Sequence, residues 1–263
     1  MLEFLEELDK FNNIVYHDEP HVYYMDGVKM KSVTTILGDY KEKFQADYWA
    51  QRKADERGIS KEEVLEEWRI INVVATTKGT IVHNYLENRL ANKVFPYPEE
   101  MALKSVGVKH APIVKKKVMT LQEMSEKFLQ DIKGKLIPVK SELVVGDAKL
   151  GICGMVDQMF YNKKVGELQI WDWKTNKKLN RNNNFGKFLK RIFKHLAECE
   201  LSIYSLQLCI YREIIRRNTN LVVGDCYIVW FFEENETYEV IKCLDLTEEV
   251  KILFDLLERE YKL

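Results

Sequence analysis

The stretch GMVDQMFYNKKVGELQIWDWKT, residues 154–175, predicts two β-strands joined by a turn, and the second strand ends in Asp172, Trp173 and Lys174. Successive strand side chains point to opposite faces, so Asp172 and Lys174 share one face of the sheet while Trp173 packs on the other. A surface ion pair contributes only about 0 to 1 kcal/mol and needs no function to explain it. The neighbouring sequence therefore has to decide between an ion pair and a functional site.

The sequence on either side of this stretch predicts an antiparallel meander. Its three strands, separated by turn signals, are VKSELVVGD (139–147), LGICGMVDQMFYN (150–162) and GELQIWDWK (166–174). Further along, the sequence predicts a helix over 197–217, the buried strand DCYIVWFFE over 225–233, and a helix from Thr247 onward. The expected order is therefore helix, three strands, helix, strand, helix.

Acidic side chains recur on these three predicted strands. Glu142, Asp157 and Asp172 each lie on a different one, and neighbouring strands are about 5 Å apart. Carboxylates that close repel one another and raise their own pKa values unless a cation lies between them. Oxygen ligands suit Mg²⁺ or Mn²⁺. Taken alone, Glu142 is more simply interpreted as an exposed strand residue, and for Asp157 an exposed acid near a turn is an equal alternative.

The N-terminal region predicts a β-hairpin followed by a helix. Aromatic and polar residues alternate over 21–33 around Asp26 and Gly27, a dipeptide that tolerates the positive φ angles of a tight turn. Thr34 or Thr35 is then expected to cap a helix.

A second helical pattern covers residues 60–92, with Gly79 as a candidate interruption. Residues 93–118 carry three of the five prolines and a Lys-Lys-Lys run. We therefore expect an irregular connection there, before a helix over 120–134.

The overall composition bounds the class of protein. A chain of 263 residues with 46% hydrophobic content can bury a sizeable core, and 40 Lys plus Arg against 41 Asp plus Glu leave no global basic field. Any nucleic-acid surface must be local. Five cysteines without a Cys-x-x-Cys pair argue against a disulfide framework or structural zinc. The apolar runs are too short to span a bilayer. We expect a soluble intracellular protein with no membrane partner, in bacterial cytoplasm, a phage-infected cell or an organelle matrix.

Taken together, GMVDQ and IWDWKT resemble the PD-(D/E)XK nuclease superfamily in its RecB-type branch. Two other motifs of that branch occur in the expected order, Gly79 to His83 on an upstream helix and Gln207 to Tyr211 on a downstream one. Each has a simpler explanation, since a lone His is more often a core or surface residue and a Gln-x-x-x-Tyr match is common by chance. Several matches in the right order are a stronger signal than any one.

The resemblance covers residues 75–232, and SVTTIL (32–37) is similar to the family of the mitochondrial genome maintenance exonuclease and its phage relatives. It implies an α/β (α+β) fold with a PD-(D/E)XK restriction-endonuclease-like core, in which helices flank a central mixed sheet. Residues 1–75 would form an N-terminal hairpin and helical region, and 76–263 the nuclease core.

The resemblance also implies the roles of individual residues. The metal ligands would be His83, Asp157, Asp172 and the backbone carbonyl of Trp173, and the catalytic set would be Lys174, Asp172, Asp157, Glu142 and Gln207. Many relatives have Glu where this chain has Asp172, which the family tolerates. The cysteines that hold an iron–sulfur cluster in some relatives are absent here, so we expect Mg²⁺ or Mn²⁺ and no iron–sulfur cluster.

Residues 177–195, KKLNRNNNFGKFLKRIFKH, form a basic segment with seven Lys or Arg and no acid. One interpretation is a solvated amphipathic helix, and the other is a surface that guides a DNA strand, on which Phe185, Phe188 or Phe193 stack on bases. The candidate DNA-binding residues are Tyr211, Lys177, Lys178, Arg181, Lys187, Lys190, Arg191 and Lys194.

These features predict a metal-dependent DNA exonuclease that acts on single-stranded DNA or DNA ends in replication, recombination or repair. Replication or recombination proteins are then candidate partners. The alternatives are a structure-specific endonuclease of the same fold and an inert nucleic-acid-binding module, whose expected sign would be loss of Asp157, Asp172 or Lys174.

Overall fold

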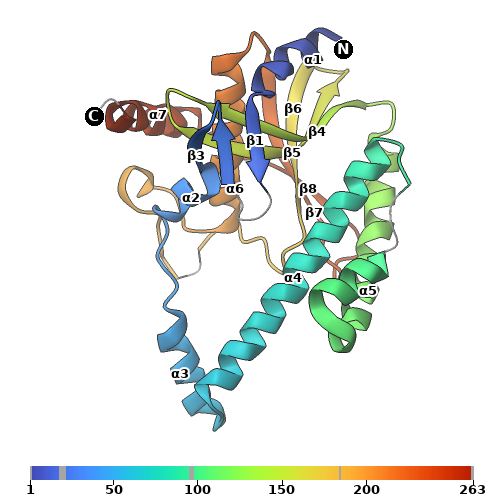
Figure 1. Cartoon of the computed structure of the whole chain (residues 1–263), viewed down its shortest axis with the longest axis vertical. Coiled ribbons are helices and arrows are strands. Elements are labelled where there is room, and N and C mark those ends of the chain that lie inside the picture. The colour runs from blue at the N-terminus through green and yellow to red at the C-terminus, as the bar shows by residue number, and fades with distance from the viewer. Residues whose placement is uncertain (1, 18–21, 95–97, 184, 262–263) are drawn as a thin grey trace.

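The computed structural model describes residues 2–17, 22–94, 98–183 and 185–261 (Figure 1). Its helices are α1 (Leu2–Leu8), α2 (Val33–Gly38), α3 (Ala46–Arg57), α4 (Lys61–Leu90), α5 (Pro98–Ile132), α6 (Glu200–Asn218) and α7 (Thr247–Tyr261), with 3₁₀ turns η1 (Asp9–Phe11) and η2 (Arg191–Phe193). Its strands are β1 (Ile14–His17), β2 (Val22–Met25), β3 (Val28–Ser32), β4 (Leu136–Asp147), β5 (Ile152–Asn162), β6 (Glu167–Lys174), β7 (Val223–Trp230) and β8 (Glu239–Lys242).

The strands form one mixed sheet, as predicted. Its order is β1-β2-β3-β5-β6-β7-β8, and β4 pairs with β5. The predicted meander is confirmed, because β5 pairs antiparallel with both β4 and β6. The pairs β6–β7 and β3–β5 are parallel, which makes the sheet mixed. The central strand β6 is buried along almost its whole length, and its polar residues Gln169 and Asp172 are buried with the apolar ones.

Helices cover both faces of the sheet. On one face, α6 and α7 pack with Ile170 and Ile228 in the largest apolar cluster. On the other, α4 and α5 pack against Trp171, Trp173 and Phe160. Neighbours along β6 therefore enter different cores, and burial of the two tryptophans turns Asp172 and Lys174 toward α6.

The hairpin prediction is confirmed for residues 22–32, while residue 21 lies outside the described residues. Asp26 and Gly27 have φ angles of 50° and 81°, the positive values that a two-residue hairpin turn requires. The predicted cap is wrong, because Ser32 rather than Thr34 or Thr35 caps α2. The Ser32 hydroxyl accepts a hydrogen bond from the Thr35 amide at 3.2 Å.

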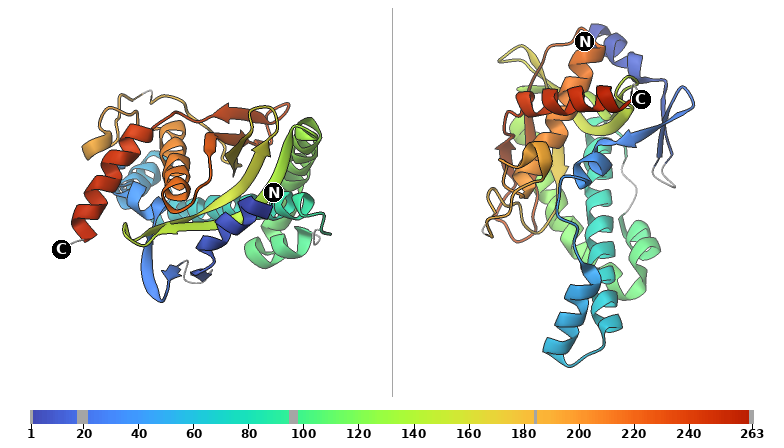
Figure 2. Two further views of the ribbon diagram at one scale, coloured as in Figure 1. Left: turned by 90° about the horizontal axis from the view of Figure 1, so that it is seen from above. Right: turned by 90° about the vertical axis from the view of Figure 1, so that its left-hand side faces the viewer.

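Helix α4 is continuous, so the predicted interruption at Gly79 is wrong. A Cβ atom at Gly79 would lie 3.2 Å from the Thr175 hydroxyl oxygen, directly after β6. The glycine therefore lets α4 approach the end of β6, one turn before His83. Figure 2 shows that α3 and the first half of α4 project away from the sheet and its covering helices.

The irregular connection predicted over 93–118 is wrong from residue 98, where α5 begins. Gly107, with φ 71°, divides α5 into two helical parts. Val114, Val118 and Leu121 are fully buried at helical spacing against α4, and this packing outweighs the prolines. The division of the chain at 75–76 stays a prediction. None of the described helices is long and apolar enough to cross a membrane.

Candidate active site

The Asp172–Lys174 pair stands at the buried end of β6. The Lys174 ammonium forms an ion pair with Asp172 Oδ2, and the side chains are only 18% and 3% exposed. Lys174 Nζ also lies 4.7 Å from the ring centroid of Tyr204 on α6, a cation–π contact. An exposed surface ion pair, the simpler interpretation of the sequence, is therefore excluded by burial.

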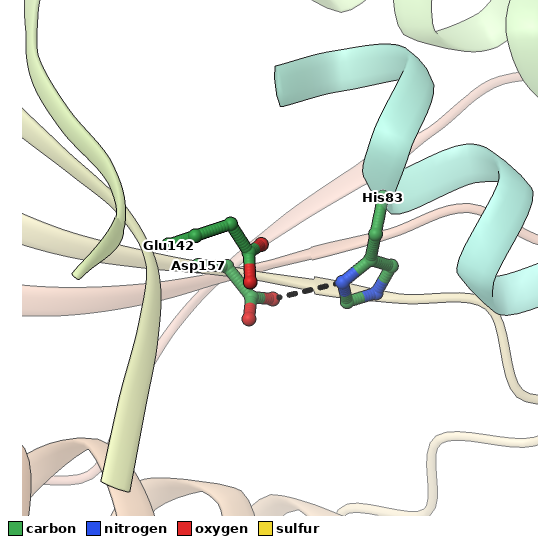
Figure 3. A group of neighbouring side chains, drawn as sticks. All are labelled: His83, Glu142 and Asp157. Carbon is green, nitrogen blue, oxygen red and sulfur yellow. Dashed lines mark ion pairs between the residues drawn. The ribbon is translucent and has the colours of Figure 1, made fainter. Parts of the chain in front are cut away.

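Asp157 and His83 meet beside the backbone of Trp173. The Trp173 amide donates a hydrogen bond to Asp157 Oδ2 at 2.8 Å, and His83 Nδ1 lies 3.5 Å from the same oxygen. His83 Nε2 lies 3.0 Å from the Trp173 carbonyl oxygen. Figure 3 shows His83 pointing from α4 toward the two carboxylates. The four predicted metal ligands therefore lie at one end of β6 and in the neighbouring elements.

Glu142 completes a compact group of ligand atoms. One atom each from His83, Glu142 and Asp157 lie within 4.8 Å of one another, a spacing that suits a metal ion. Glu142 also has φ 46°, in the left-handed region that non-glycine residues rarely adopt. Such strain costs on the order of 1 to 3 kcal/mol and is typical of functional sites.

The electrostatics favour a cation among these groups. Burial, followed by the charges of Asp157, Glu87 and Asp172, raises the pKa of Glu142 to about 8. Burial also raises the pKa of Asp172 above its usual value, against the effect of Lys174. For Lys174 itself, burial opposes the charge, but Asp172 and Asp157 outweigh it and raise the pKa of the ammonium.

The donor set fits a hard divalent cation. Asp172 Oδ2 is buried and contacts the Lys174 ammonium, yet it accepts no well-aligned hydrogen bond from any described residue. An imidazole, several carboxylate oxygens and a backbone carbonyl are ligands that Mg²⁺ or Mn²⁺ accepts, and a cation would relieve the repulsion among the carboxylates.

Helix α6 supports the site from the other side. Gln207 Nε2 donates a hydrogen bond to the Tyr211 hydroxyl at 2.9 Å. Tyr211 is 2% exposed and packs against Gly154, so the predicted DNA contact of Tyr211 is wrong. Gln207 is hydrogen-bonded to Tyr211 and, among the described residues, to no carboxylate. Its catalytic role stays a prediction.

Two neighbours of Glu142 were not predicted from the sequence. The charge of Glu87 raises the pKa of Glu142. Glu87 lies four residues after His83 on α4, and this spacing could have predicted that the two side chains share one face of the helix. Tyr23 on β2 is close enough for the Glu142 charge to raise the tyrosine pKa, after the larger effect of burial. No local pattern links Tyr23 with Glu142, because the two are far apart in the sequence.

The basic segment is irregular apart from η2, so the interpretation as an amphipathic helix is wrong. Its seven basic side chains are exposed, but folding brings acids to two of them. Lys187 pairs with Glu42 at 2.5 Å, and Arg181 pairs with Glu239. The predicted DNA contacts of the segment stay a prediction.

The three phenylalanines of the basic segment differ in burial. Phe193 is fully buried, and stacking on a base is excluded for it. Phe185 and Phe188 are 87% and 56% exposed, so their stacking on bases stays a prediction.

In a comparison with known proteins, the family model of the PD-(D/E)XK nuclease superfamily matches residues 46–253 of the chain. The match extends from α3 into α7 and includes every site residue that the sequence predicted, whereas Tyr23 lies outside it. No curated protein matches the chain.

Proposed function

Because the chain belongs to the PD-(D/E)XK nuclease superfamily, whose members hydrolyse phosphodiester bonds of DNA with divalent metal ions, we propose that it is an exonuclease of the RecB-type branch. Its substrate is single-stranded DNA or a DNA end. This activity serves DNA replication, recombination or repair.

One observation carries the proposal: four sequence motifs, carried by α4, β5, β6 and α6, converge at the end of β6. The His83 ring contacts the Trp173 carbonyl and Asp157, while Lys174 contacts Asp172 and Tyr204. Tyr211 packs against Gly154, and Gln207 donates a hydrogen bond to its hydroxyl. An inert module has no need for a buried lysine–carboxylate pair, which is costly to desolvate.

The residues divide the work as follows. His83, Asp157, Asp172 and the Trp173 carbonyl would hold the metal, with Glu142 beside them. Bound there, a divalent cation would supply polarisation of the scissile phosphate and a lower pKa for a water molecule. Lys174 remains a charged ammonium, because Asp172 and Asp157 raise its pKa, so it orients the attacking water and stabilises negative charge on the phosphate. The Trp173 amide fixes the orientation of Asp157.

The test uses DNA substrates that separate exonucleases from endonucleases. The protein is incubated with Mg²⁺ or Mn²⁺ and with end-labelled single-stranded, linear duplex or closed-circular DNA. We expect loss of label from linear DNA and intact circles, and no cleavage in EDTA. Asp172→Asn should be inactive, and Lys140→Ala, which changes an exposed lysine of β4, should keep full activity. Cleavage of circles would overturn the exonuclease proposal, and metal-dependent cleavage by Asp172→Asn would overturn the site.

A further inference from the structure

A cavity lies on the opposite face of the sheet from Lys174. Its volume is about 630 Å³, within the range of small-molecule sites. It opens where the C-terminal end of α5 meets the turn between β5 and β6. Trp171 lines it, and Trp171 packs on the α5 side of β6, whereas Asp172 faces α6. The cavity is therefore separate from the candidate active site.

The walls of this cavity are aromatic. The rings of Trp171 and Tyr227 are stacked, with centroids 4.6 Å apart and planes inclined by 24°. Phe128 lies 5.9 Å from Trp171 and 5.3 Å from Tyr238, in tilted and edge-on arrangements. Tyr227 and Tyr238 are half-buried, so their rings remain partly accessible. Walls of this kind favour a planar ring system over a flexible aliphatic ligand.

A buried amide supplies a hydrogen-bond donor in the same cavity. Gln169 is 3% exposed, and its Oε1 accepts hydrogen bonds from Trp171 Nε1 and Asn162 Nδ2, both at 3.3 Å. An indole N–H can only donate, so it fixes which end of the amide faces Trp171. The Gln169 Nε2 group then has no partner among the described residues, and it is not sealed from the cavity. This amide N–H is therefore available in the cavity to donate a hydrogen bond to an acceptor atom of a ligand.

The mouth of the cavity is positively charged. Lys163 and Lys164 are exposed in the turn after β5, and neither pairs with an acid of the described ranges. Lys135 donates to the Asp131 carbonyl oxygen at 2.7 Å. Asp131 is the single acid among the described lining residues, and its carboxylate accepts a hydrogen bond from Tyr238 at 2.5 Å. Two adjacent unpaired lysines suit a phosphate group.

We propose that this cavity binds a nucleobase that carries a phosphate. The base packs between the aromatic side chains and accepts a hydrogen bond from Gln169 Nε2, and the phosphate binds Lys163 and Lys164. A free mononucleotide and the terminal nucleotide of a DNA strand share this chemistry. The site is distinct from the proposed nuclease function, because it needs neither the metal nor the residues at the end of β6.

Calorimetric titration of the full chain in EDTA tests the proposal without any cleavage. The probes are dAMP, deoxyadenosine, inorganic phosphate and a 5′-phosphorylated oligonucleotide. EDTA removes the divalent metal on which phosphate binding at the candidate active site depends, and the variants described next distinguish the two sites. We expect saturable binding of dAMP, weaker binding of deoxyadenosine, and no binding of phosphate alone at the same concentration.

Variants at the mouth and in the wall identify the site. Lys163→Ala/Lys164→Ala should weaken dAMP binding at least tenfold, and Gln169→Leu should weaken dAMP and deoxyadenosine alike. The matched control, Lys140→Ala/Lys149→Ala, removes two exposed lysines that do not line the cavity and should change nothing. Because Gln169 is buried, the fold of Gln169→Leu is compared with that of the parent protein by circular dichroism. If Gln169→Leu misfolds, the test depends on the variant of the exposed Lys163 and Lys164.

Two outcomes support the proposal and two overturn it. Binding of dAMP that depends on Lys163 and Lys164 identifies a free nucleotide as the ligand. If only the binding of the oligonucleotide depends on these lysines, the ligand is the terminal nucleotide of a DNA strand. The proposal would be overturned if neither dAMP nor the oligonucleotide bound saturably. It would also be overturned if the lysine and Gln169 variants bound these probes with unchanged affinity.

Discussion

The contact between Gly154 and Tyr211 allows a quantitative test of how the motif GMVDQ supports the site. A Cβ atom at Gly154 would lie 2.2 Å from Tyr211 Cε1 and 2.7 Å from its Cζ and hydroxyl oxygen. Ordinary carbon contacts are about 3.5 to 4.0 Å, so in Gly154→Ala the buried ring must move by more than about 1 Å. Overpacking of this kind costs about 1 to 3 kcal/mol.

Thermal unfolding measures this cost directly. For a chain of this size, about 1 kcal/mol lowers Tm by about 2 to 4 °C, so a cost of about 1 to 3 kcal/mol in Gly154→Ala should lower Tm by about 2 to 12 °C. The ring carbon, not the hydroxyl, makes the shortest contact. Tyr211→Leu should therefore cancel part of the loss in the double variant, and Tyr211→Phe should not. The two positions should show a coupling energy on the order of 1 kcal/mol in a double-mutant cycle.

Gly38→Ala is the matched control, because nothing lies within 4 Å of a Cβ atom at this position in α2. Alanine is favoured over glycine in a helix, so this variant should be as stable as the parent or slightly more stable. An unchanged Tm in Gly154→Ala, or an equal loss in the Tyr211→Leu background, would refute the proposed packing.

Three further predictions concern the chemistry, the DNA path and pH. Lys174→Ala should abolish metal-dependent cleavage and leave the far-UV circular dichroism unchanged, and persistent cleavage would contradict its role. Lys190→Ala/Lys194→Ala should reduce the salt slope of DNA binding by on the order of one to two units. Arg181→Ala/Lys187→Ala, which changes two residues already paired with acids, should reduce the salt slope less. An equal reduction in the two double variants would argue against phosphate contacts at Lys190 and Lys194. The raised pKa of Glu142, about 8 against an ordinary 4.5, means that the folded metal-free protein binds more protons than the unfolded chain between these values. Its stability should fall as pH rises through that window. Because the pKa of Asp172 is also raised, Glu142→Gln should reduce the fall in EDTA without removing it, and parallel curves of Tm against pH for the two proteins would refute this.

Local patterns in the sequence determined the elements that hold the site. Segments rich in strand-forming residues and separated by turn signals predict β4, β5 and β6, and the side-chain period of two predicts that Asp172 and Lys174 oppose Trp173. The order of the four motifs predicted which side chains meet. These predictions succeed because each depends on residues that are neighbours in the chain or on a known order of elements.

Tertiary packing decided the rest. The second part of α5 is helical because Val114 and Val118 pack on α4, which outweighs the local effect of proline. Contacts between distant segments account for the ion pair of Lys187 with Glu42 and for the burial of Tyr211 beneath Gly154. The positive φ of Glu142 and the raised pKa of its carboxyl arise in the same way. Such properties depend on which surfaces face each other in the folded chain, and no local sequence pattern specifies that.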